Sequence, residues 1–96
     1  MKKDQMFGFS LILLVIGQGL YAQSEQRDVK IRIENGYNFI FNGDIGNAIE
    51  AFTDAINIDP VSHSAYLGRG KAYSRVRNFE NAIRDLSKAI EIASVL

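Results

Sequence analysis

The side chains that could carry catalysis or hold a metal ion are few in this sequence. His63 is its one histidine, and it stands between Ser62 and Ser64. Nothing in the sequence fixes a carboxylate on the far nitrogen of His63, as a Ser–His–Asp triad requires. The sequence has no cysteine, which excludes thiolate nucleophiles, disulfides and cysteine zinc sites. We therefore predict a protein that is not an enzyme and that uses no metal and no cofactor.

One short segment has the composition of a phosphate-binding loop. Residues 68–71 read Gly-Arg-Gly-Lys, but a phosphate loop lies between a strand and a helix. Here the segment lies inside a helical pattern, so phosphate binding is not expected. The acids Glu50, Asp54 and Asp59 are spaced as ordinary exposed residues of a helix and a turn.

The charge balance bears on the class of partner. The sequence has 11 Lys and Arg residues against 11 Asp and Glu residues. Removing residues 1–22 takes away Lys2, Lys3 and Asp4, which leaves 9 basic and 10 acidic residues. Nucleic-acid binding usually shows as a clustered basic face. A nearly neutral chain favours a protein or peptide partner over nucleic acid or an anionic membrane surface.

The first 22 residues have the layout of a secretory signal peptide. A basic start is followed by an apolar run over residues 6–16 and ends at the small residue Ala22. We expect cleavage after Ala22, although Leu20 leaves the exact site open. An uncleaved anchor or a buried helix are alternatives, but a membrane span needs about 20 apolar residues and residues 17–19 interrupt this run. The pattern predicts a bacterial chain exported to the periplasm, the outer envelope or the medium, in contact with the membrane only during export.

The rest of the sequence repeats itself at a spacing of 34 residues. A shift of 34 places Gly36 on Gly70 and aligns residues 47–49 with 81–83, both Asn-Ala-Ile, without a gap. The further matches are Phe39 with Tyr73, Phe52 with Leu86, Thr53 with Ser87, Ala55-Ile56 with Ala89-Ile90, and Ile58 with Ile92. Such a period is the signature of a repeat architecture.

Each unit contains two helical patterns. Apolar residues at 48, 49, 52, 55 and 56 share one helix face, and positions 82, 83, 86, 89 and 90 repeat this stripe. Asp44, Ser62 and Asn78 stand where a side chain can accept a bond from the free N–H groups of a first helical turn, and Gly43 suits a tight turn. Pro60 ends a helix. We predict an all-α chain with helices at about 29–42, 45–58, 63–76 and 79–93.

Small residues recur at matching positions of the two units. Gly36 and Gly70 lie within helices, where glycine costs up to about 1 kcal/mol relative to alanine. Close helix approach would explain them, with Ala48 and Ala82 as the matching small surfaces and with Tyr66 and Phe79 among the aromatics that fill the space around them. The expected repeat-packing residues are Gly36, Phe39, Ala48, Phe52, Ala55, Pro60, Gly70, Tyr73, Ala82, Leu86 and Ala89.

This set of residues resembles the tetratricopeptide repeat. Residues 29–62 look like one repeat and residues 63–96 like a second, after a short linker at 23–28. The resemblance implies two helix–turn–helix repeats, a fragment of an α-solenoid, that bind peptides or proteins along the first helix of each repeat. Some members of the family clamp a carboxylate there with Lys and Asn. The corresponding positions are Ile33 and Tyr37, so we do not carry that activity over.

The resemblance also implies which residues line the binding groove. They are Lys30, Ile33, Tyr37, Ile40, Phe41, Ser64, Leu67, Lys71, Ser74 and Arg75. The first repeat would present an apolar, aromatic patch and the second a basic one, which suits a segment with an apolar anchor beside an acidic or C-terminal carboxylate group. At helical spacing, Ile33, Tyr37 and Ile40 could equally be core residues. Lys71 and Arg75 could be only a solvated face.

Two repeats leave little margin for stability, because each repeat buries its apolar face on its neighbours and about three are usually needed. We therefore expect the helix at 79–96 to be covered by a second copy or by a partner.

The favoured function is a protein–protein interaction scaffold of the bacterial cell envelope. The alternatives are a binder of an envelope lipid, glycan or peptide, and the front piece of a larger exported repeat protein, ligand-binding or enzyme-associated, with no independent activity.

Overall fold

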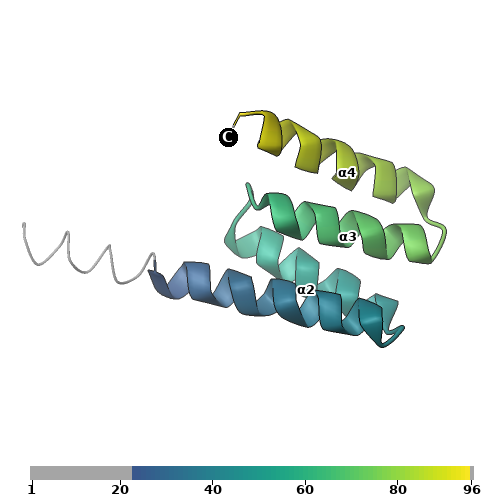
Figure 1. Cartoon of the computed structure of the whole chain (residues 1–96), viewed down its shortest axis with the longest axis horizontal. Coiled ribbons are helices and arrows are strands. Elements are labelled where there is room, and N and C mark those ends of the chain that lie inside the picture. The colour runs from purple at the N-terminus through teal and green to yellow at the C-terminus, as the bar shows by residue number, and fades with distance from the viewer. Residues whose placement is uncertain (1–22, 96) are drawn as a thin grey trace, which may run out of the picture.

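The computed structural model describes residues 23–95, which form helices and no strand. The first helix covers residues 23–41 and is followed by α2 (Ile45–Ile58), α3 (His63–Arg75) and α4 (Phe79–Ser94). Figure 1 shows each helix beside the next, with short turns between them. The all-α repeat architecture expected from the sequence is thus confirmed. The expected signal peptide, residues 1–22, lies outside the described residues.

The first helix begins before the position that we expected. Residues 23–28, which we predicted to be a linker, are helical and continue directly into the first repeat. They contain neither Gly nor Pro, and Gln, Glu and Arg are good helix formers, so nothing in this segment stops the helix. Val29 is buried and anchors this end of the helix on the core. No helix within residues 23–95 is both long and apolar enough to cross a membrane.

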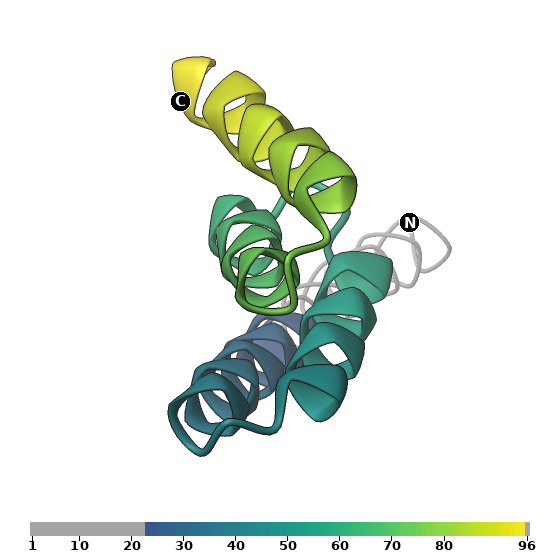
Figure 2. The same ribbon diagram turned by 90° about the vertical axis from the view of Figure 1, so that its right-hand side faces the viewer.

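The order of the helices in space follows their order in the sequence. α3 packs against α2 on one side and against α4 on the other. Figure 2 shows the first helix and α2 at one end of the stack and α4 at the other. Since short loops join antiparallel neighbours, each turn determines which helices can pack together.

Three turns separate the helices, and their capping differs from one to the next. Gly43 has a φ of 79°, the left-handed conformation that a tight turn after a helix needs. Ser62 and Asn78 each accept a bond from the backbone N–H three residues later, at 3.2 Å and 3.4 Å, so these two predicted caps are confirmed. The prediction for Asp44 is wrong. Its side chain makes no capping bond to the backbone, because its carboxylate accepts the Asn47 side-chain amide at 2.7 Å.

The core of the stack is built around Phe52, the largest side chain that is fully buried in the described residues. A Cβ atom placed on Gly36 would lie 2.6 Å from two carbons of the Phe52 ring, and a Cβ on Gly68 would lie closer still. The ring therefore occupies space that only glycines of the first helix and α3 leave free. Phe52 lies one helical turn from Ala48, and the two share a buried cluster with Ala72.

The second repeat reproduces this contact in a looser form. A Cβ on Gly70 would lie 2.8 Å from Leu86 Cδ2 and 3.3 Å from the Ala82 carbonyl oxygen. Seven of the expected packing residues are buried: Gly36, Ala48, Phe52, Ala55, Gly70, Ala82 and Ala89. Phe39, Tyr73 and Leu86 are half-buried.

Two residues that we expected to take part in the packing of the repeats are exposed. Pro60 lies in the turn before α3, where it acts on the course of the chain rather than on the core. Phe79, the first residue of α4, is 52% exposed.

Candidate functional site

The ten residues predicted to line a groove come from the first helix and from α3, and we call them the groove face. In Figure 2 these two helices lie on the same side of α2. Six groove-face residues are exposed: Lys30, Phe41, Ser64, Lys71, Ser74 and Arg75. The other four are half-buried: Ile33, Tyr37, Ile40 and Leu67. All ten thus keep some surface that a partner could contact.

The apolar members of the groove face also support the core. Ile33, Tyr37 and Ile40 pack against the buried cluster that contains Phe52. Burial raises the pKa of the Tyr37 phenol above its ordinary value, so this hydroxyl stays protonated at neutral pH and can donate a hydrogen bond. The two interpretations of these residues from the sequence, core and surface, therefore apply together.

A contact between Lys71 and Tyr37 joins the parts of the groove face that lie on the two repeats. The Lys71 ammonium lies 5.6 Å from the centre of the Tyr37 ring. The same ring meets Phe52 edge-on, with 5.2 Å between the ring centres. A cation over an aromatic face is held by the ring quadrupole, yet Lys71 is exposed and keeps donors for an anion. This junction presents an apolar surface and a positive charge side by side.

Phe41 extends the apolar part of the groove face toward the end of the first helix. Its ring is 90% exposed. An aromatic ring left in water makes a favourable contact with any apolar group that covers it, because about 25 cal/mol is gained per Å² of apolar area buried.

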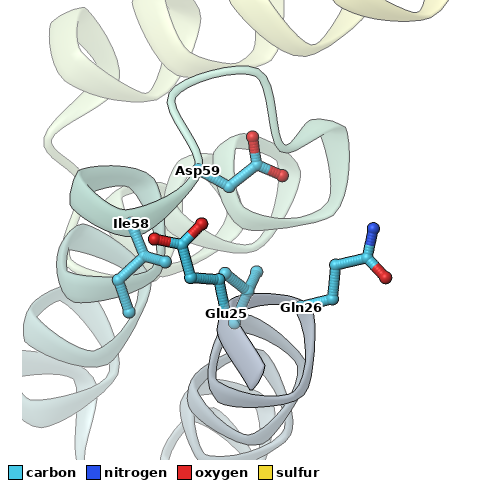
Figure 3. A pocket seen from close by; sticks show the side chains of 5 residues that line it. Glu25, Gln26, Ile58 and Asp59 are labelled. Carbon is cyan, nitrogen blue, oxygen red and sulfur yellow. The ribbon is translucent and has the colours of Figure 1, made fainter. Parts of the chain in front are cut away.

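A separate hollow, which we did not predict, lies between the start of the first helix and the end of α2. It has a volume of about 360 Å³ and is lined by Glu25, Gln26, Val29, Ile58 and Asp59. Figure 3 shows the Glu25 and Asp59 carboxylates at its rim. Asp59 also accepts a bond from the Val61 N–H at 3.2 Å, as expected for a turn residue. Within residues 23–95 no three His, Asp or Glu side chains are grouped to hold a metal ion.

A buried ion pair, also not predicted, ties three helices together. Asp85 on α4 is 3% exposed and accepts two bonds from Arg69 on α3, at 2.7 Å from Nε and 2.8 Å from Nη2. The Arg69 Nη1 donates to the Thr53 hydroxyl on α2 at 3.2 Å. The bonds to Asp85 raise the pKa of Arg69 despite its partial burial. Arg69 therefore stays charged, and its bonds to Asp85 and Thr53 hold α3 between its neighbours.

The sequence did contain a signal for this pair. Asp85 falls three residues after Ala82 and four before Ala89, so it stands on the apolar stripe of its helix. An acid among buried positions needs a partner. The rings of Tyr66 and Tyr73 flank the partner Arg69, with their centres 5.6 Å and 6.0 Å from the guanidinium carbon.

Comparison with known proteins agrees with the geometry of both repeats. A family model for the tetratricopeptide repeat matches residues 36–62 and 63–95. The chain belongs to the tetratricopeptide repeat family. The second match begins at His63, the first residue of α3, and ends within the turn after α4.

Curated relatives match parts of the chain. It is 33% identical over 51 residues to Hsp70-Hsp90 organizing protein 2 of Arabidopsis thaliana, with 53% of this chain and 9% of the relative covered. Tetratricopeptide repeat protein 36 of Caenorhabditis briggsae is 39% identical over 49 residues, 51% of this chain and 27% of that protein. Tetratricopeptide repeat protein 6 of Homo sapiens is 35% identical over 66 residues, 69% of this chain and 13% of that protein. The chain thus spans less than a third of each of these three relatives.

Tetratricopeptide repeats are modules of protein–protein interaction, and this chain is built from two of them. The family places its binding surface along the first helix of each repeat. In this chain the first helix and α3 carry the groove face, on which Lys71 and Tyr37 are in contact.

Proposed function

We propose that this tetratricopeptide repeat chain is a scaffold of the bacterial cell envelope that binds a peptide or partner protein through the groove face and catalyses no reaction. The contact between Lys71 and Tyr37 carries the proposal, because it joins an apolar and a cationic surface across the two repeats. The relatives support the general class, since one of them is named for organizing Hsp70 and Hsp90.

The chemistry of the groove face defines the segment that it would bind. An apolar anchor would cover Tyr37 and Phe41, and a carboxylate would meet Lys71 and Arg75. These two cations stand four residues apart on α3, which places them on one helix face. A segment with a bulky apolar residue beside Asp, Glu or a free C-terminus satisfies both requirements.

We expect selection of a random peptide library on the immobilised full chain to enrich such segments. Replacing Lys71 with Gln should weaken a selected acidic peptide by about tenfold, the effect of losing one charge-assisted hydrogen bond of about 1.4 kcal/mol. Binding is measured by isothermal titration calorimetry, and the loss should shrink at high salt because an exposed pair is screened.

Lys88→Gln is the matched control, since Lys88 lies on α4, away from the groove face. This variant should bind the selected peptides as the parent chain does. If the library yields no acidic consensus, or if both lysine variants lose the same affinity, the groove face is not the binding surface.

We further propose that the chain is exported, on the basis of the layout of residues 1–22. When the full chain is expressed in a bacterium with a C-terminal tag, mass spectrometry of the envelope and medium fractions should find a product that begins near Gln23. Leu14→Arg interrupts the apolar run and should leave the full-length mass in the cytoplasm. A parent chain that keeps its full-length mass in the cytoplasm would contradict export.

A further inference from the structure

One side of α4 packs on α3, and the other side carries apolar side chains in the open. Phe79, Ile83 and Ile90 are 52%, 65% and 70% exposed. Leu86 is half-buried at the edge of this side, where it also lies against Gly70 of α3. The spacing of these four residues places them on one helix face. Figure 2 shows α4 at the end of the stack. We call these four residues the outer face of α4.

The 34-residue period identifies the same face on α2. Counting back 34 residues from the outer face of α4 gives Ile45, Ile49, Phe52 and Ile56. On α2 none of the four is exposed, and three of them pack in the cluster that includes Ala72 of α3. The equivalent face of α2 is therefore packed against another helix, α3, within the same molecule.

The cover is a helix with small residues at fixed spacing. Ala65, Gly68 and Ala72 of α3 are all buried, and they follow one another at i, i+3 and i+7. At the central position even a methyl group would overlap the Phe52 ring. The small residues form the depression that receives the bulky side chains of α2.

We propose that the outer face of α4 binds an amphipathic helix of a partner protein that carries small residues at i, i+3 and i+7, packed as α3 packs on α2. This surface is separate from the groove face, and the inference does not rest on the proposed function. Burying Phe79, Ile83 and Ile90 would remove a contiguous apolar surface from water, which supplies the driving force.

The chemistry of the chain disfavours a second copy as the occupant. In a head-to-tail stack the first helix of one copy would cover α4 of the next, and its residues equivalent to Ala65, Gly68 and Ala72 are Ile31, Glu34 and Asn38. Glu34 would bring a carboxylate to the position where only glycine fits. Two outer faces set against each other would bring bulky side chains together without the small residues that let helices approach.

The test uses the full chain and a synthetic peptide of residues 62–78, capped at both ends, as the stand-in helix. This peptide carries the small-residue pattern of α3. In ¹⁵N-labelled protein we expect saturable amide shifts at Ile83, Leu86 and Ile90. A peptide with Gly68→Leu should bind at least about tenfold more weakly, since a bulky side chain blocks close approach.

Variants of the chain keep the test specific. Ile83→Ser should weaken the peptide at least about tenfold, whereas Arg84→Ser, the neighbouring exposed residue, should leave its affinity unchanged. Because both side chains are exposed, both variants are expected to fold. Three results would overturn the proposal: no shifts at millimolar peptide, shifts confined to the first helix, or a concentration-dependent dimer of the chain alone that protects the outer face of α4.

Discussion

Replacing Phe52 with alanine is expected to lower the free energy of unfolding by about 3–5 kcal/mol, the range for truncating a large aromatic residue in a core. Phe52 is fully buried and fills the space between Gly36 on the first helix and Gly68 on α3. Its loss leaves a cavity that two glycines cannot fill, and it also removes the edge-on contact with Tyr37. The variant would therefore lose the contact with Gly68 between the repeats in addition to the contact with Gly36 within the first repeat.

The measurement is urea denaturation followed by circular dichroism. A chain of this size has only a few kcal/mol of stability, so Phe52→Ala is measured in sucrose or trimethylamine N-oxide, which favour the folded state, and Phe52→Leu provides a milder step. Phe41→Ala is the control, because Phe41 is 90% exposed and its loss should change stability by no more than about 0.5 kcal/mol. Equal losses for Phe52→Ala and Phe41→Ala would show that the glycine-lined site is not the centre of the core.

The contacts within one repeat could be read from the sequence, because they occur twice. Gly36 and Gly70 align at the 34-residue shift, as do Phe52 and Leu86, and each glycine faces its expected partner helix. The caps at Ser62 and Asn78 were predicted from their capping side chains rather than from the shift. Asp44 aligns with Asn78 at this shift but makes no capping bond. Residues that recur at the 34-residue spacing are those that pack within each repeat.

The contacts between repeats occur once, so the period could not reveal them. Gly68 receives Phe52 of the preceding repeat, whereas its equivalent in the first repeat is Glu34, which is exposed. In the same way, Arg69 and Asp85 align with Asn35 and Ala51. These positions differ between the two repeats, and in the second repeat they form the contacts with α2 and within the ion pair.

The groove face was only partly predictable for a different reason. Helical periodicity placed its residues on the first helix and α3, but exposure depends on how the two helices approach each other. Tyr37 supports the core through Phe52 and also lies beneath Lys71. That dual role follows from the packing angle between the repeats, which residue spacing within a helix does not determine.

The second large effect is expected at the buried ion pair. Asp85→Ala should lower the free energy of unfolding by about 3 kcal/mol, because it leaves the Arg69 guanidinium without its carboxylate. We expect the lower end of the usual range since the Arg69 side chain is 20% exposed and can recover some hydration. The loss should change little with salt, in contrast to a surface pair. Urea denaturation at low and high salt measures both quantities.

The first repeat supplies the matched rescue, because its residues at the two aligned positions are Asn35 and Ala51. The double variant Arg69→Asn, Asp85→Ala should therefore be more stable than Asp85→Ala alone, since it removes the unpaired charge together with its partner. Glu80→Ala provides the surface control: it breaks the exposed pair with Arg84 and should cost no more than about 0.5 kcal/mol. A double variant as unstable as the sum of its two single variants would mean that Arg69 and Asp85 act separately, and that α3 is held in place by apolar packing alone.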